Sequence, residues 1–267
     1  MKVSWRNRIV LPALFTAIIL MGFTFLAVCE DASAGAMVEL NKSDRDALAV
    51  LGRGVVGKAL PAWPIKDTAR LIPLRKGKWT YQITAGEREG KHQVMSISKT
   101  DRKDEQSLWD RSVDGDCTEF FSVKGDGAIN LVSEIYLKHD AIIHYTPMLP
   151  VMFDGMKPGD KTQVETEIKI YDLHDPTHLK YKGRLKVIYA YLGVYEITVP
   201  AGKYEAVLIK SSYRGKVGPA HVVDGGYAFY ARGVGMVASI ERMHVTAFIF
   251  YDKRTKTPKV LIQKGGS

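Results

Sequence analysis

Apolar and polar residues alternate along most of the chain after Trp79. Short runs of β-branched and aromatic residues are separated by Gly, Asp or Pro clusters, which is the pattern of strands and turns. No helical pattern long enough for a parallel crossover lies between the runs, so we expect antiparallel pairing. About a dozen runs fit this pattern: Lys78–Thr84, Gln93–Ser98, Thr118–Val123, Ile129–Lys138, Ala141–Thr146, Gln163–Tyr171, Leu179–Tyr191, Tyr195–Val199, Tyr204–Tyr213, Gly226–Ala231, Met236–Arg242, Val245–Tyr251 and Lys259–Gln263.

The alternation also predicts which strands are buried on one face and which on both. In Gln163–Tyr171 the charged Glu165 and Glu167 share one face with a lysine, while apolar residues share the other, as in a strand with one wet side. Tyr204–Ile209 and Val245–Tyr251 are largely apolar on both faces. We therefore predict a mainly β protein with a curved antiparallel sheet, a half-barrel or barrel-like, filled by side chains, a helix or a ligand.

One helix is expected before the strands. Ser43 is followed by acidic residues and then by apolar residues at helical spacing up to Val55, which predicts an N-cap and an amphipathic helix of about 12 residues. Pro61 and Pro64 prevent the helix from continuing. Residues 58–72 are therefore expected to form an irregular connector.

The first 34 residues have the composition of a secretory signal peptide. Basic residues precede an uncharged run from Ile9 to Cys29, and the small-x-small triplet Ala32–Ala34 follows. We predict cleavage after Ala34 or Ala36 and a periplasmic or secreted protein. The expected plan is a signal peptide, a helix with its connector, and an antiparallel β domain: 1–34, 35–72 and 73–267.

The leader has two alternatives to cleavage after Ala34 or Ala36. The uncharged run of about 21 residues is long enough to stay in a bilayer as an anchor, although Pro12 and the cleavage triplet disfavour this. In a lipoprotein, Cys29 would become the acylated first residue, but Val28 stands where such a site needs a small residue. We therefore expect Cys29 to be discarded with the leader.

The charge of the chain favours anionic partners. The formal charge is +9, and residues 1–34 hold three basic and two acidic residues, so the remainder carries 9 − 1 = +8. Outside the cytoplasm the available anions are lipid headgroups, lipopolysaccharide or acidic polymers rather than nucleic acid, although plain solubility explains the same charge. Only Cys117 would remain after cleavage, so no intrachain disulfide is expected. Basic residues near the end either meet anionic headgroups or form a solvated turn: Lys253, Arg254, Lys256 and Lys259.

Motifs that resemble cofactor and metal sites are better explained as turns. Gly233–Ala238 matches the dinucleotide fingerprint, but a strand pattern follows it, so we interpret its glycines as a bend. His174 and His178 flank Pro176 with no further ligands nearby in sequence. Asp114–Asp116 lacks the remaining positions of a calcium loop. We predict no metal and no cofactor.

Candidate catalytic residues are equally weak. Ser96 and Lys99 match a Ser-x-x-Lys motif, but within a strand rather than at the start of a helix. Cys117 has no histidine near it in sequence, although spatial neighbours stay open. Glu165 and Glu167 are the obvious carboxylate pair, yet they lie on a solvated strand face. We predict no catalytic residue.

One apolar segment differs from the other turns. Loops are normally polar, whereas Tyr145–Met156 holds large apolar side chains between prolines. Methionine adapts to irregular apolar partners, which suits a lid or mouth over an apolar ligand. The alternative is a plug that closes one end of the sheet as ordinary core. The predicted ligand-binding residues are Tyr145, Met148, Leu149, Met152, Phe153 and Met156.

Two turn sequences carry a resemblance to known proteins. Val199–Val207 and Tyr230–Val237 resemble a group of bacterial secreted proteins of unknown function, and Leu71–Leu74 with Trp79 is similar to their opening strand. The resemblance covers roughly residues 70–262. The group is similar in architecture to the lipoprotein-carrier half-barrels of the LolA/LolB type, whose concave sheet holds acyl chains. The shared motifs are turn chemistry, so the resemblance implies a fold more strongly than an activity.

We therefore predict a non-enzymatic binding protein of the cell envelope that holds a lipid, a lipoprotein acyl chain or another apolar ligand on a concave sheet. One alternative is an envelope assembly or interaction factor, and a weaker one is a hydrolase acting on an envelope polymer. A closed cavity would favour binding and an exposed apolar patch would favour assembly. Converging carboxylates or histidines in a cleft would favour hydrolysis.

Overall fold

Strands dominate the computed structural model, which describes residues 35–100, 109–247 and 251–265. The predicted leader, 1–34, lies outside the described residues. The helical segments are α1 (Lys42–Leu48), η1 (Ala49–Leu51), α2 (Thr68–Leu71) and η2 (Leu137–His139). The strands are β1 (Val56–Leu60), β2 (Gly77–Ile83), β3 (His92–Lys99), β4 (Trp109–Val113), β5 (Cys117–Val123), β6 (Ile129–Tyr136), β7 (Ala141–Pro150), β8 (Lys161–Asp172), β9 (Leu179–Val199), β10 (Gly202–Val217), β11 (Ala220–Ala231), β12 (Gly235–Ala247) and β13 (Tyr251–Gln263).

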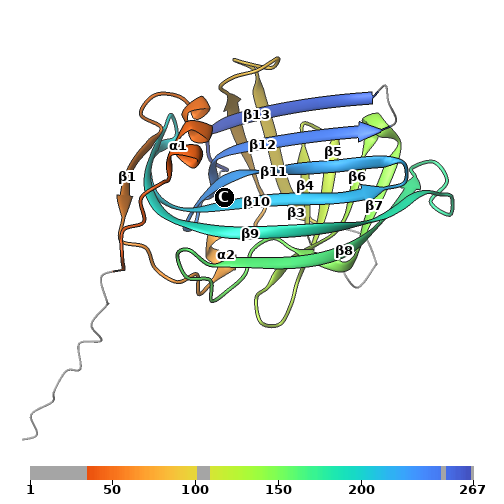
Figure 1. The fold of residues 1–267 in the computed structure, drawn as a ribbon, viewed down its shortest axis with the longest axis horizontal. Coiled ribbons are helices and arrows are strands. Elements are labelled where there is room, and N and C mark those ends of the chain that lie inside the picture. Colours follow the sequence, from red (N-terminus) through yellow and green to blue (C-terminus); the bar gives the residue numbers. More distant parts are fainter. Residues whose placement is uncertain (1–34, 101–108, 248–250, 266–267) are drawn as a thin grey trace, which may run out of the picture. The chain divides into compact units, whose positions relative to one another are not determined.

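The antiparallel sheet closes on itself to form a barrel. Twelve strands, β2 to β13, form a ring that closes because β8 pairs with β9. Strand β1 is not part of the ring and pairs with another stretch of β9. The closing contact runs from Lys161 opposite Ala190 to Tyr171 opposite Leu179. Figure 1 shows the long strands β8 to β13 on one side of the ring and the shorter β2 to β7 behind them. The prediction of an antiparallel β protein is confirmed, and the barrel is closed rather than a half-barrel.

Several element boundaries differ from the predicted ones. Trp109–Val113 forms the additional strand β4, whose charged residues hide its alternation, and the expected connector contains β1 and α2. The predicted break around Gly193 is a bulge inside β9, since Leu208 pairs with Gly193 and the next residue of β10 pairs with Tyr191. The prediction of one strand over Val245–Tyr251 is wrong, because Ala247 of β12 pairs with Tyr251 of β13; residues 248–250 lie outside the described residues.

The four basic residues expected in a turn or at a headgroup surface all belong to β13, so the solvated-turn interpretation is wrong. Arg254 and Lys256 are exposed, and the Lys259 side chain is only 5% exposed. The two strand-burial predictions that the described side chains cover are confirmed. Every residue from Ala206 to Ile209 is buried, and Glu165 is exposed whereas Thr166 and Ile168 are buried.

Helix α1 identifies the outer face of the barrel. It begins after Asn41, whose side chain accepts from the backbone N–H of Asp44 and caps the helix, so the cap lies two residues before the predicted Ser43. Asp44 accepts hydrogen bonds of 2.6 Å from both Lys210 Nζ and Tyr227 Oη, which are direct cross-strand partners on β10 and β11. Residues adjacent to these two along each strand therefore face the interior.

The connector and the segment after β7 cover one end of the barrel, which we call the capped end and define as residues 61–75 and 151–156. Ile65 and Met156 are buried, and the N–H of Ile65 donates to the carbonyl of Met156 at 2.9 Å. Tyr191 Oη donates to the carbonyl of Trp63 at 2.8 Å. The opposite end, which we call the far end, carries the turns that join β4 to β5, β6 to β7, β8 to β9 and β10 to β11.

Glycines allow neighbouring strands to approach closely. A Cβ atom on Gly226 would lie 2.0 Å from the carbonyl oxygen of Ile240, and one on Gly215 would lie 2.1 Å from that of Arg184. These distances are far below any real carbon–oxygen contact, so both positions require glycine. Such positions are typical of sharply curved sheets.

Candidate binding site in the barrel interior

Charged and aromatic side chains from several strands meet inside the barrel. Arg111 of β4, Glu119 of β5 and Glu134 of β6 are successive cross-strand partners, so they share the inward face. Tyr230 of β11 and Arg111 both line a small cavity of about 20 Å³, which is room for about one water molecule. Strands β4 and β11 are not neighbours in the ring, so these side chains approach each other across the interior.

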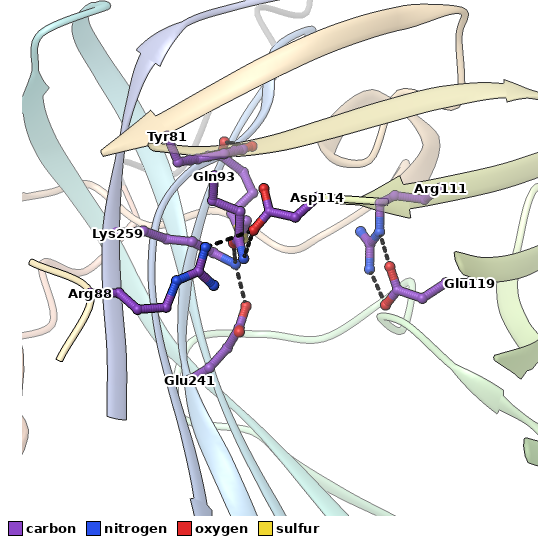
Figure 2. A network of polar contacts seen from close by, with 9 residues as sticks. Tyr81, Arg88, Gln93, Arg111, Asp114, Glu119, Glu241 and Lys259 are labelled. Atoms are coloured by element: carbon purple, nitrogen blue, oxygen red, sulfur yellow. Dashed lines mark hydrogen bonds and ion pairs between the residues drawn. The ribbon is translucent and has the colours of Figure 1, made fainter. Parts of the chain in front are cut away.

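Arg111 and Glu119 form a two-bond ion pair (Figure 2). Arg111 Nη2 donates to Glu119 Oε1 at 2.7 Å, and Arg111 Nε donates to Oε2. The side chains are only 20% and 15% exposed, and the guanidinium carbon lies 4.8 Å from the centre of the Phe121 ring. Paired hydrogen bonds of this kind are among the strongest that a protein makes. Glu119 is thus the counter-ion of Arg111.

Glu134 is a second interior carboxyl with a different environment. It is 8% exposed, and Tyr145 Oη donates to its Oε2 at 2.8 Å. Burial, reinforced by the nearby Glu119 carboxylate, raises the pKa of Glu134 to about 7, although the Tyr145 hydrogen bond and Arg111 oppose the change. The site therefore places a carboxyl that is hydrogen-bonded to arginine beside a carboxyl whose pKa is raised.

Aromatic hydroxyls and one further acid face the interior from the long strands. Tyr213 of β10 lies directly opposite Val187 and Asp224. Burial raises the pKa of Asp224 to about 6, and Glu241 adds to the rise. Tyr189 Oη donates to the carbonyl of Pro150 at 2.6 Å. Among the described residues, strands β9 to β11 therefore present hydroxyl and carboxyl groups to the interior but no lysine or arginine.

A second polar network links β3, β12 and β13 (Figure 2). Lys259 Nζ donates to Gln93 Oε1 at 2.7 Å and to Glu241 Oε1 at 2.5 Å. Asp114, in the turn after β4, accepts from Gln93 Nε2 at 3.3 Å and from Arg88 Nη2 at 2.9 Å. The Lys259 side chain is 5% exposed whereas that of Glu241 is 60% exposed. Glu241 belongs to the inward-facing set, so solvent reaches the interior near the far end.

One wall of the interior is apolar. Ile143 of β7 lies opposite Ile170 of β8, and Leu185 of β9 lies on the same inward face as Val222 of β11, with Gly215 between them. All four apolar side chains belong to one hydrophobic cluster, which continues to the capped end. The interior thus combines an aliphatic wall on β7 to β11, interrupted by Tyr213 and Asp224, with a polar side on β3 to β6.

The six predicted ligand-binding residues occupy two environments. Tyr145 lies on the interior wall and contacts Glu134. Met148 accepts a weak hydrogen bond from Ser122 Oγ, with a distance of 3.4 Å to its sulfur. The others pack at the capped end, where Phe153 stacks edge-to-face on Tyr189; Leu149, Met152 and Met156 are at most 4% exposed. They form the floor beneath the interior, and their role in ligand binding stays a prediction.

The motifs interpreted as turns are turns in the structure. Gly233 and Gly235 have φ angles of 72° and 94° between two antiparallel strands, and His174 lies in the turn between β8 and β9. Burial, together with Glu119 and Glu134, raises the pKa of Cys117 to about 12, which makes it a poor nucleophile. Among the described residues, no group of three His, Cys, Asp or Glu side chains is arranged to hold a metal ion.

Helices long and apolar enough to cross a membrane are not found in the described part of the chain.

Comparisons with known proteins found only distant similarity. No protein-family model matches the chain, and no curated protein does. A candidate lipoprotein from Parabacteroides distasonis is 15% identical with a TM-score of 0.34, covering 73% of this chain and 97% of that one. A candidate exported protein with a YmcC-like fold from Bacteroides fragilis is 12% identical with a TM-score of 0.40, covering 76% and 99%. The hypothetical lipoprotein YmcC from Escherichia coli is 11% identical with a TM-score of 0.33, covering 74% and 94%. At these values the likeness carries no argument about this chain.

The sequence did not point to the most heavily charged part of the interior. Arg111 and Glu119 flank the turn Asp114–Asp116, and their alternation with small polar residues resembles a solvated strand. Their spacing around a tight turn of a hairpin would have placed them opposite each other. That signal required β4 to be recognised first.

Proposed function

We propose that this chain is an exported, non-enzymatic binding protein of the cell envelope whose barrel interior takes up an amphipathic lipid. The observation that carries the proposal is the two-sided interior, in which an aliphatic wall faces a polar side with a buried arginine and a partly protonated carboxyl. In this proposal an acyl chain would lie along Ile143, Ile170 and Leu185, and its polar group would reach Glu134, Tyr145 or Arg111. Export is supported by the basic, apolar and small-residue order of 1–34.

The size of the ring supports a ligand in the interior. Side chains fill a barrel of about eight strands completely, whereas barrels of 16 strands or more enclose a channel. A ring of twelve strands lies between these cases, and here the capped end is packed while Glu241 is exposed to solvent. The ligand would therefore enter from the far end and rest on the floor formed by Leu149, Met152 and Met156.

Hydrolysis of an envelope polymer is the second candidate, and one observation favours it. Glu119 and Glu134 are directly opposite each other, one ionised and one with a raised pKa, as a nucleophile and a general acid would be. Binding is the better explanation because both Oε atoms of Glu119 accept hydrogen bonds from Arg111, which leaves a weak nucleophile. Loss of reducing-end release from peptidoglycan in Glu134→Gln would support hydrolysis instead.

A matched pair of substitutions tests lipid binding. Val222 faces the interior and Val223, the next residue, faces outward, because Val222 pairs with Gly215 and Val223 with Arg214. Val222→Trp fills the interior and Val223→Trp places the same ring outside. The assay is fluorescence titration with a dansylated fatty acid, with displacement by phosphatidylglycerol. We expect the wild type to bind the probe saturably, Val222→Trp to weaken this binding at least about tenfold, and Val223→Trp to leave it unchanged. Equal weakening by the two substitutions, or no saturable binding by the wild type, would refute lipid uptake.

A further inference from the structure

Cations gather on the outer face of the long strands, away from α1. The outer basic face is defined by exposed residues of β9, β10, β12 and β13: Arg184, Lys186, Arg214, Lys216, Arg242 and Lys256. Each is one position away from an inward residue of its strand, so all six point away from the interior. This surface is unrelated to the lumen described above.

The cations of the outer basic face oppose one another directly. Arg184 pairs with Lys216, and Lys186 pairs with Arg214. Arg242 pairs with Lys256 in the same way on β12 and β13. Like charges in direct cross-strand positions destabilise a sheet. Partial burial and the charge of Arg242 lower the pKa of Lys256, which is the expected sign of this repulsion.

Two acidic residues with described side chains lie along one border of this face. Glu165 and Glu167 of β8 are opposite Lys186 and Arg184, and Glu167 also pairs with Lys169 at 3.1 Å. Among the described residues, no carboxylate forms an ion pair with Arg214, and the same holds for Lys216, Arg242 and Lys256. Among the described side chains, no ion pair offsets this repulsion at these four positions.

Exposed apolar side chains interrupt and border the cations. Val223 is 46% exposed and lies directly between Arg214 and His244 in the register. Leu179, at the far-end margin of β9, is 41% exposed. A hollow of about 440 Å³ lies nearby and is lined by Lys182, Arg184, Lys216, Glu167 and two glycines. A soluble polyanion gains nothing from exposed Val and Leu, whereas a lipid surface contacts both charged and apolar side chains.

We propose that the outer basic face binds the surface of an anionic lipid bilayer. The cations meet lipid phosphates, while Val223 and Leu179 enter the headgroup layer. Each Lys or Arg near such a surface contributes a favourable increment that salt screens. Binding would hold the far end of the barrel close to the membrane, where the lipid proposed for the lumen would be available.

Vesicle flotation tests this docking. The secreted protein, with its N-terminus determined by intact mass, is mixed with vesicles of phosphatidylcholine alone or with phosphatidylglycerol added. We expect flotation only with phosphatidylglycerol, and at least about tenfold less of it when salt rises from 0.05 to 0.5 M. The double variant Arg214→Glu with Lys216→Glu should lower the partition coefficient at least about 100-fold, because two attractions become two repulsions.

A matched control makes the same change of charge elsewhere. Lys124→Glu with Lys157→Glu alters two exposed residues in turns at the capped end, and this variant should still float with the vesicles. Equal loss in both double variants would show a general charge effect and overturn the proposal. A circular dichroism melt establishes that each variant is folded, and the milder Val223→Ser should weaken flotation without a change of charge.

Two further outcomes would also overturn the proposal. One is tight binding of soluble heparin together with no flotation on phosphatidylglycerol vesicles, which would identify a polyanion site. The other is equal flotation on both kinds of vesicle. Val222→Trp separates this proposal from the proposed lipid uptake, because it should abolish binding of the dansylated fatty acid and leave flotation unchanged.

Discussion

Replacing Glu134 by Gln should make the stability of the protein less sensitive to pH. In the folded protein Glu134 has a pKa of about 7, against the usual value of 4.5. Such a carboxyl is protonated in the folded state and ionised in the unfolded state between these pH values. Its contribution to stability is therefore complete below pH 4.5 and is lost as pH rises through 7.

The magnitude follows from the two pKa values. Linkage gives a total loss of about 3 kcal/mol, most of which falls between pH 5 and pH 8. Gln cannot ionise and occupies nearly the same volume, so Glu134→Gln avoids the loss. The free energy of unfolding of the variant, minus that of the wild type, should therefore be about 2 kcal/mol higher at pH 8 than at pH 5.

Urea unfolding of both proteins at pH 5 and pH 8 measures this difference. Asp224 also has a raised pKa, about 6, but it is present in both proteins and cancels. Glu165→Gln, at an exposed position of β8, is the control and should show no such pH dependence. The reasoning would be refuted if the difference between Glu134→Gln and the wild type were the same at both pH values.

Three further predictions concern the interior and the ring. Arg111→Met leaves the Glu119 carboxylate buried without its cation and should lower the free energy of unfolding by about 3–5 kcal/mol; the double variant with Glu119→Gln should recover part of it, and an unchanged urea midpoint in Arg111→Met would contradict the pairing. Cys117 is partly exposed and its pKa is raised to about 12, so at pH 8 iodoacetamide should label it much more slowly in the native protein than in urea, and equal labelling rates would contradict this. Gly226→Ala brings a Cβ to within 2.0 Å of a backbone oxygen and should lower the melting temperature by at least about 5 °C; Gly125→Ala, with open space around it, is the control and should have no comparable effect.

Much of the fold could be predicted from alternation alone. Tyr204–Ile209 has apolar residues on both faces, and in the structure one face packs near α1 and the other packs in the interior. Burial of both faces could therefore be predicted from the sequence. Closure of the barrel could not be predicted, because it depends on the long pairing of β8 with β9, which no local sequence pattern encodes. A half-barrel and a closed barrel have the same strand sequences and differ only in that contact.

The candidate site was harder to predict because its charges point inward. Arg111 and Glu119 made residues 109–119 resemble a polar turn region, and their burial follows only from the position of β4 and β5 in the ring. The raised pKa of Glu134 likewise depends on Glu119, from the neighbouring strand, and on Tyr145, from the next one. Hydrophobic patterning cannot detect a buried polar group whose partners lie on other strands.

The apolar segment after Tyr145 shows the opposite case. Its composition indicated burial, and Leu149, Met152 and Met156 are buried. Composition could not distinguish a lid from a floor, because both bury the same side chains. The hydrogen bond between Ile65 and Met156 places the segment against the connector at the capped end.

Native mass spectrometry of the protein purified from its own cell envelope tests lipid uptake most directly. The account predicts a species one lipid heavier than the bare chain, a lipid recovered by solvent extraction, and loss of that adduct in Val222→Trp but not in Val223→Trp. A single species at the mass of the bare chain, with no lipid in the extract, would contradict it.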